Sequence, residues 1–238
     1  MVMPGKMSRH LRRYLADMSN NGKSALLISG GSINREYIAG YLKDRKFSMT
    51  VAIDGGLAVA DEMGIMPTHI VGDYDTVSDK ILSKYLDEPG VQVVKLNPEK
   101  DFTDTQSAFN LVMENGCTDV FIIGGTGTRL DHTIANIQTL QMFLGRCNAV
   151  IINENNRIRL IDKKTVIKKD EAFGKYVSFL PLTEKVTGLT LKGFKYELNN
   201  YEFNLRETFS LGVSNELADD VAYADMKDGI LIMIESCD

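Results

Sequence analysis

The 238-residue sequence contains no tryptophan and only three histidines. So few histidines exclude a histidine-rich metal site and argue against histidine acid–base chemistry. One of the three, His132, is more readily explained as a structural hydrogen-bonding group than as a base. Acidic residues must therefore carry any catalysis, together with a metal ion.

Cysteine is also scarce, with only Cys117, Cys147 and Cys237, which are widely spaced. They form neither a zinc-binding spacing nor a disulfide framework, which favours a reducing cytoplasm. No apolar stretch reaches the roughly 20 residues that span a bilayer. The basic N-terminus lacks the apolar segment of a signal peptide, so we expect a cytoplasmic protein with a mobile or helical extension over residues 1–23.

Strong charge of either sign is missing as well. The formal net charge is -5 and the isoelectric point about 5.3, so no nucleic-acid or membrane surface is indicated. Hydrophobic residues make up 44% and charged residues 25%, which is ordinary for a globular protein of one large or two small domains. An acidic enzyme can still bind ATP, because local basic groups and a metal outweigh the net charge.

Short apolar runs alternate with amphipathic segments through the first part of the chain. Most of the runs lead into loops that contain glycine or aspartate, as expected for buried parallel strands. Strands alternating with helices of about 10–15 residues predict a doubly wound, mainly parallel α/β domain over residues 1–153. The expected strands cover residues 24–29, 49–53, 68–71, 91–96, 119–123 and 149–152.

The pattern changes from residue 154 onwards. Short runs rich in β-branched and aromatic residues recur about every ten residues, separated by turn residues, without a long helical period. This predicts a small all-β sandwich over residues 154–238. The expected fold class is therefore α/β + β.

Two aspartates one residue apart, Asp73 and Asp75, follow the third expected strand. Strand residues alternate sides, so both carboxylates can point to the same side where the strand ends. Carboxylates held that close repel each other unless a cation neutralises them, and Mg²⁺ is usually held by one or two carboxylates and substrate phosphates. The stretch indicates a metal–phosphate site, although an isolated Asp-x-Asp is also common in solvated turns.

Other loops at the carboxyl ends of the strands favour the metal site. Ligands of a parallel sheet bind beyond these ends, where loops distant in sequence converge. Asp54 precedes two glycines that let a ligand approach the backbone, although it could also be a helix N-cap. The phosphate-binding glycines expected in the first two loops are Gly30, Gly31, Gly55 and Gly56.

Residues 100–104 place a cation and carboxylates in one loop, as a phosphate–metal site requires. Lys100 can neutralise a phosphate, Thr103 is a candidate phosphate-binding residue, and Asp104 can face the metal. Thr103 is also predicted to cap a helix, because Gln106 follows three residues later. The two roles of this loop are compatible.

A glycine-rich loop follows the fifth expected strand, at residues 124–129. It lacks the order of a P-loop, but glycines such as Gly125 and Gly127 can still cradle phosphate through backbone N–H groups. Arg129 would clamp phosphate with its planar guanidinium. Asp131 stands at the next helix start, where a negative charge also stabilises a helix.

Taken in this order and spacing, these segments resemble the thiamine pyrophosphokinase family, and the C-terminal half is similar to its bacterial members. Substitutions relative to the family are mild (Leu57, Tyr74, Thr76 and Thr128) and remove no carboxylate. The aromatic residue that stacks on thiamine in animal members has no clear counterpart. The resembling segments are residues 52–56, 72–76, 100–104, 127–137, 188–198 and 212–216.

The resemblance implies transfer of the pyrophosphoryl group of ATP to the thiamine hydroxyl, giving AMP and thiamine diphosphate. It implies Mg²⁺ as cofactor, with one of the site carboxylates accepting the hydroxyl proton. The expected metal ligands are Asp54, Asp73, Asp75 and Asp104, and the expected catalytic residues are Asp73, Asp75, Asp104, Arg129 and Asp131.

Ser214 and Asn215 would orient thiamine, which the family binds between the α/β domain of one subunit and the β domain of its partner. The resemblance thus implies a homodimer.

Two other functions stay open. A pterin pyrophosphokinase would keep the carboxylates, but the thiamine-type C-terminal segments argue against it. A nucleotide-binding sensor without turnover would be expected to lose carboxylates, and all are present.

Overall fold

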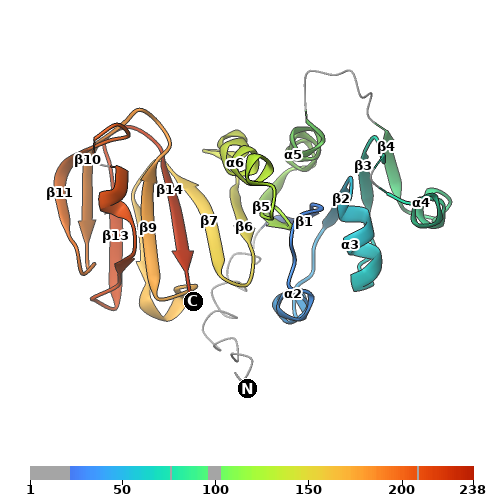
Figure 1. The fold of residues 1–238 in the computed structure, drawn as a ribbon, viewed down its shortest axis with the longest axis horizontal. Helices are drawn as coiled ribbons and strands as arrows, with labels where there is room; N and C mark the ends of the chain where they lie inside the picture. The colour runs from blue at the N-terminus through green and yellow to red at the C-terminus, as the bar shows by residue number, and fades with distance from the viewer. Residues whose placement is uncertain (1–21, 76, 96–102, 208) are drawn as a thin grey trace. The chain divides into compact units, whose positions relative to one another are not determined.

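The computed structural model describes residues 22–75, 77–95, 103–207 and 209–238 (Figure 1). Lys100, Thr76 and nearly all of the expected N-terminal extension lie outside these residues. The chain forms two compact units, one over Asn21–Glu154 and one over Asn155–Asp238. The predicted α/β + β fold class is confirmed.

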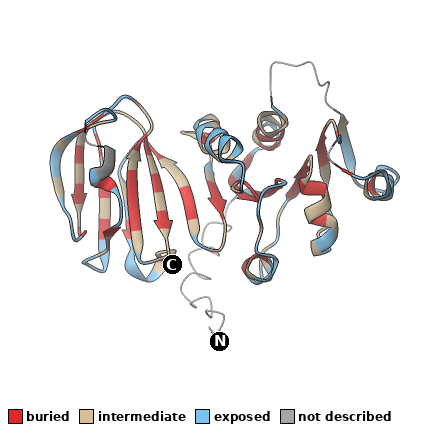
Figure 2. Ribbon diagram, viewed as in Figure 1, coloured by how far each residue is buried: buried red, intermediate tan, exposed pale blue. Residues whose placement is uncertain are grey.

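The first unit is built on a parallel sheet with the strand order β6-β5-β1-β2-β3-β4. Its central strands are almost fully buried, which explains their continuous apolar runs (Figure 2). The strands are β1 (Lys23–Ile28), β2 (Met49–Ile53), β3 (His69–Gly72), β4 (Gln92–Lys95), β5 (Cys117–Ile123) and β6 (Asn148–Ile152).

The strand order reverses between β1 and β5. Because parallel crossovers are right-handed, connections running from β1 towards β4 and those returning through β5 to β6 place their helices on opposite faces of the sheet. Such a reversal opens a crevice at the carboxyl ends of the two strands, where ligands bind in open α/β sheets. The helices are α2 (Arg35–Leu42), α3 (Gly56–Met63), α4 (Asp79–Leu86), α5 (Asp104–Glu114) and α6 (Leu130–Thr139).

Local sequence signals set several helix ends. Asn34 caps α2 by accepting from Tyr37 N at 3.1 Å. Thr103 and Gln106 form the predicted capping box of α5, with both reciprocal hydrogen bonds present. Helix α6 ends at Thr139, and the chain continues as the 3₁₀ helix Leu140–Phe143.

The second unit contains two antiparallel sheets, ordered β12-β9-β14-β7 and β11-β10-β13-β8. Their buried side chains form one apolar core, in which the Phe179 and Phe194 rings meet edge to face at 5.4 Å. The strands are β7 (Asn156–Ile161), β8 (Thr165–Lys168), β9 (Tyr176–Pro181), β10 (Lys185–Lys192), β11 (Leu198–Asn204), β12 (Asn215–Glu216), β13 (Val221–Asp225) and β14 (Leu231–Ser236).

None of the helices in the described part of the chain has both the length and the apolar character needed to cross a membrane.

Candidate active site

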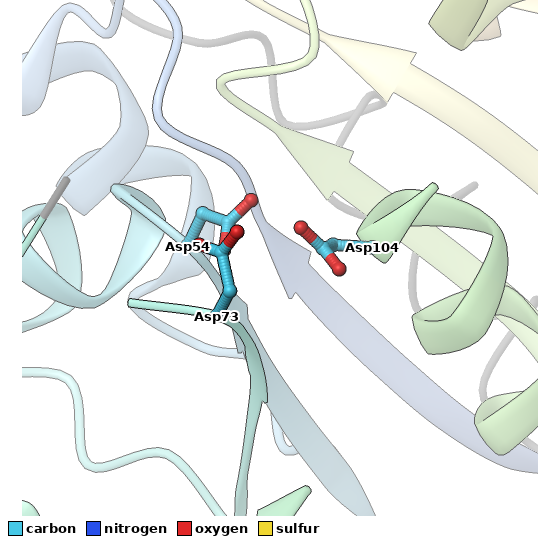
Figure 3. Close-up of side chains that lie close together, drawn as sticks. All are labelled: Asp54, Asp73 and Asp104. Carbon is cyan, nitrogen blue, oxygen red and sulfur yellow. The ribbon is translucent and has the colours of Figure 1, made fainter. Parts of the chain in front are cut away.

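Three carboxylates meet at the carboxyl ends of the parallel strands. Asp54 follows β2, Asp73 follows β3 and Asp104 begins α5. One carboxylate oxygen from each lies within 4.8 Å of the other two, and all three side chains are half-buried. Figure 3 shows Asp104 facing Asp54 and Asp73 across a short gap. We call these three residues the carboxylate cluster.

The backbone around Asp54 is unusual and firmly held. Asp54 has a φ of 46°, a left-handed conformation that is uncommon outside glycine. Its N–H donates to Val71 O at 3.0 Å, and its carbonyl accepts from Leu57 N at 2.9 Å. Strained backbone that the surrounding structure enforces is frequent at functional sites. These bonds fix Asp54 beside the end of β3.

Gly72, the last residue of β3, makes room for the Asp54 carboxylate. A Cβ at Gly72 would lie 2.0 Å from Asp54 Oδ1, and the φ of 155° is itself unfavourable for other residues. We expect Gly72→Ala to displace Asp54 and to lower kcat/KM by about 10–100-fold, since misplacement by about 1 Å has effects of this size. Steady-state kinetics of the folded variant measure the loss.

Gly64→Ala is the matched control, because Gly64 also has a positive φ (64°) but a Cβ there would meet no atom within 4 Å. It should strain the backbone without reducing activity. Wild-type activity of Gly72→Ala would contradict the positioning role of Gly72.

The negative charges of the carboxylate cluster repel one another when no cation is bound. Burial, followed by the nearby Asp104 and Asp73 carboxylates, raises the pKa of Asp54 to about 7. Asp54 Oδ1 is also buried without a hydrogen-bond partner among the described residues. Carboxylate oxygens that repel each other are hard ligands, which suit a divalent cation such as Mg²⁺. The residues present therefore fit the expected metal.

Asp75 is not part of the cluster that the described residues form. It is exposed, and its N–H donates to Asp73 Oδ1 at 3.2 Å. The expectation that both carboxylates share one side assumed a continued strand, but β3 ends at Gly72 and Tyr74 has a φ of 66°. Strand alternation therefore does not apply, and the sequence-based reason for grouping Asp75 with Asp73 is wrong.

Tyr74 anchors this turn, a role that the sequence did not reveal. The side chain is buried, and its hydroxyl lies within hydrogen-bonding distance of two carbonyl oxygens, Ile70 O at 3.1 Å and Val94 O at 3.2 Å. These contacts tie the turn that carries Asp73 to β3 and β4.

A pocket of about 460 Å³ lies where β1, β2 and β5 end, beside the reversal of strand order. Two of its loops are joined backbone to backbone, since Gly31 N donates to Gly124 O at 3.0 Å and Ser32 N to Thr126 O at 2.8 Å. A Cβ at Gly31 would lie 2.3 Å from Thr126 O, so only glycine fits there. The expected site residues that line the pocket are Gly30, Gly31, Asp54, Gly55, Gly125, Gly127 and Arg129.

Two expected phosphate-binding residues have structural roles. Gly56 lets α3 pack closely on β1, because a Cβ there would lie 1.9 Å from Ile28 O. Thr103 caps α5. Neither is among the residues that line the pocket.

Arg129 and Asp131 are paired with each other. Arg129 Nε lies 3.3 Å from Asp131 Oδ1, and its NH2 lies 2.6 Å from Asp131 Oδ2. The hydrogen bond to Arg129 lowers the pKa of Asp131, which makes this carboxylate a weaker base. Arg129 lines the pocket together with His132, whereas Asp131 does not.

In the second unit, the expected thiamine-site residues adjoin an exposed aromatic ring. Ser214 is exposed, whereas the Asn215 side chain is buried and engaged with Tyr196. Asn215 Oδ1 accepts from Tyr196 N at 3.0 Å, and Asn215 Nδ2 donates to Tyr196 O at 2.8 Å. Tyr196 is 59% exposed, and the Lys195 ammonium lies over its ring, 5.5 Å from the ring centroid. Asn215 therefore positions Tyr196.

A parallel α/β sheet with glycine loops at its point of reversal and a neighbouring carboxylate cluster defines a nucleotide-dependent, phosphate-transferring enzyme. Residues 42–152 match the family model described as thiamin pyrophosphokinase, catalytic domain, and residues 164–231 match thiamin pyrophosphokinase, vitamin B1 binding domain. The chain belongs to the thiamin pyrophosphokinase family.

Individual relatives agree with this membership. Thiamine pyrophosphokinase of Bacillus subtilis (strain 168) is 33% identical over 227 residues, which are 91% of this chain and 100% of the relative. A crystal structure of the Bacillus subtilis protein matches with a TM-score of 0.79 at 32% identity over 91% and 100% of the two chains. Thiamin pyrophosphokinase from Geobacillus thermodenitrificans matches with a TM-score of 0.77 at 27% identity over 90% and 98%.

Proposed function

We propose that this chain transfers the pyrophosphoryl group of ATP to the hydroxyl of thiamine, giving thiamine diphosphate and AMP. The thiamine oxygen attacks the β-phosphorus, the bond from that phosphorus to the α–β bridging oxygen breaks, and AMP leaves. The observation that carries the proposal is the carboxylate cluster beside a glycine-lined pocket, in a chain that belongs to this family.

Mg²⁺ would be held by Asp54, Asp73 and Asp104 and, when bound, would neutralise charge on the transferring phosphates. A carboxylate of the cluster accepts the proton of the thiamine hydroxyl. Arg129 exchanges its contact with Asp131 for the triphosphate, because a guanidinium binds either anion with the same two-pronged geometry. Lys100 is proposed as a second phosphate-binding cation.

Thiamine is proposed to bind against Ser214 and the Tyr196 ring. The thiazolium is a cation, and an aromatic face that already attracts the Lys195 ammonium offers it a suitable surface. We further propose a homodimer in which the partner subunit shares the thiamine site, and a cytoplasmic location, which the three free cysteines suit.

Product analysis tests the proposed function. The protein incubated with ATP, Mg²⁺ and thiamine should form AMP and thiamine diphosphate in equal amounts, and EDTA should stop the reaction. ADP as the nucleotide product would overturn the proposal. AMP formed only when a pterin alcohol replaces thiamine would identify a pterin pyrophosphokinase, and absence of any product would favour a nucleotide sensor.

Mg²⁺ affinity should depend on pH through Asp54. Its raised pKa of about 7 means that Asp54 holds a proton at pH 6 and loses it by pH 8. Metal binding requires the ionised form, so Mg²⁺ affinity should rise about tenfold over this range, and binding at pH 6 should release a proton. Titration calorimetry in buffers of different ionisation enthalpy measures both quantities.

Asp54→Asn is the control for this titration, because its amide cannot ionise. The variant should bind Mg²⁺ weakly and with little dependence on pH over the same range. A wild-type affinity that does not change between pH 6 and pH 8 would show that Asp54 is not the titrating ligand.

Tyr196→Ala should raise the KM for thiamine about tenfold, because a cation–π contact in a partly desolvated site is worth about 1–2 kcal/mol. Tyr196→Phe keeps the ring and should retain a KM near that of the wild type. The KM for ATP should be unaffected in both variants. An unchanged thiamine KM in Tyr196→Ala would exclude the ring from the thiamine site.

A further inference from the structure

The glycine loop at residues 124–127 has its carbonyl oxygens occupied by donors from the protein. Gly124 O accepts from Gly31 N at 3.0 Å, and Thr126 O accepts from Ser32 N at 2.8 Å. The carbonyl between them, Gly125 O, accepts from the side-chain amide of Asn136 at 2.9 Å. Two of these donors are backbone N–H groups, whereas Asn136 donates from its side chain. A substitution can therefore remove the Asn136 donor alone.

Asn136 holds the loop from α6. The residue is half-buried and lines the pocket. Thr133 lies three residues earlier and therefore on the same helix face, where its hydroxyl accepts from Gly127 N at 3.2 Å. One face of α6 thus clamps the glycine loop at two points. These two side-chain hydrogen bonds fix the conformation of the glycine loop.

The arrangement favours a polyanion in the pocket. Carbonyl oxygens carry partial negative charge and repel phosphate, but each of these three already faces an N–H group. The N–H groups of Thr126 and Thr128 donate to no other residue in the described ranges, so they remain available to phosphate oxygens. Releasing Gly125 O would place an uncompensated acceptor in the pocket wall and loosen the loop.

We propose that Asn136 is a positioning residue for ATP, which holds the 124–127 loop in the conformation that receives the triphosphate. The inference rests on the proposed function, since it takes ATP as the occupant of this pocket. Asn136 acts on the nucleotide through the Gly125 carbonyl and has no part in thiamine recognition. Its loss should therefore affect the two substrates unequally.

Asn136→Asp and Asn136→Ala test the proposal. Asp cannot donate to Gly125 O and adds repulsion, whereas Ala only removes the donor. The dissociation constant of Mg–ATP, measured by calorimetry without thiamine, should rise at least tenfold in Asn136→Asp and about threefold or more in Asn136→Ala. The KM for ATP should rise in parallel, and the KM for thiamine should stay within twofold of the wild type.

Gln138→Glu is the matched control, since Gln138 is exposed on the same helix and does not line the pocket. It introduces the same charge and should leave ATP affinity within twofold. Wild-type ATP affinity in a folded Asn136→Asp protein would overturn the proposal. So would equal rises in both KM values, or failure of both Asn136 variants to fold, because either result indicates a general structural role.

The ATP titration also separates this inference from the proposed function. A wild-type protein that binds ATP, with the expected weakening in the variants, but forms no thiamine diphosphate would contradict only the function. A wild-type protein that does not bind ATP would contradict both.

Discussion

Asp73→Asn should lower kcat by about 10²–10³-fold while the protein stays folded, a loss typical of removing one preorganised electrostatic group from an active site. Asp73 contributes a carboxylate oxygen to a cluster whose members lie within 4.8 Å of one another. Asparagine keeps the shape and can still accept the hydrogen bond from Asp75 N, but it removes the charge that would hold Mg²⁺. Single-turnover kinetics and a thermal melt measure the two effects separately.

Two comparisons sharpen this experiment. Asp79→Asn, in the first turn of α4, removes an exposed charge from the same region and should leave kcat near that of the wild type. Asp75→Asn tests the ligand set directly, because Asp75 shares the motif with Asp73 but lies outside the cluster. A loss as large as that of Asp73→Asn would show that Asp75 joins the cluster once Mg²⁺ binds. Undiminished turnover in Asp73→Asn would exclude Asp73 as a metal ligand.

Glu235→Gln should reduce the free energy of unfolding by about 3–5 kcal/mol, because it leaves a buried guanidinium without its counter-charge. Glu235 on β14 is fully buried and pairs with Arg157 on β7, with Arg157 Nε 2.6 Å from Oε2 and NH2 2.5 Å from Oε1. Phe173 N donates to the same carboxylate at 3.2 Å. Urea denaturation followed by circular dichroism measures the loss.

Glu184→Gln is the matched control, because its ion pair with Arg206 is exposed on both sides at 68% and 79%. It should change the free energy of unfolding by at most about 0.5 kcal/mol, since exposed pairs contribute little. Equal stability of the two variants would contradict the structural importance of the buried pair.

The same pair predicts how the protein responds to acid. Burial opposes ionisation of Glu235, but the charges of Arg157 and Arg159 outweigh it and lower its pKa. A carboxyl group whose pKa is lower in the folded than in the unfolded state stabilises the fold. This contribution is complete above the unfolded pKa of about 4.3 and is lost as the pH falls from there through the lower folded pKa. Glu235→Gln should therefore remove part of the acid-dependent loss of stability.

The fold could be predicted well because its signals are local. Continuous apolar runs of buried strands, such as Leu26–Ile28, and the capping box of Thr103 and Gln106 depend only on near neighbours in the chain. The convergence of Asp54, Asp73 and Asp104 also followed from the sequence. Parallel strands bring their carboxyl ends to one edge, so residues after different strands must meet there.

The sequence was misleading or silent where the structure depends on the conformation of a few residues or on contacts between distant segments. Asp75 was grouped with Asp73 by strand alternation, which the left-handed turn at Tyr74 interrupts. The sequence also did not reveal that the amide of Asn215, which stays a predicted thiamine contact, bonds the backbone of Tyr196, 19 residues earlier. Side-chain hydrogen bonds of this kind leave no periodic signal in a sequence.

The sequence by itself determined the α/β + β fold, the strand-end loops and the carboxylates that can hold a metal, because hydrophobic period and turn chemistry are encoded residue by residue. Only the tertiary structure decided which carboxylates share one cluster and which side chains hold the loops around it. Asn136 reaches Gly125 O, and Arg157 reaches Glu235, across separations of 11 and 78 residues. Such contacts depend on the distance and direction between packed elements, which the order of residues along the chain does not state.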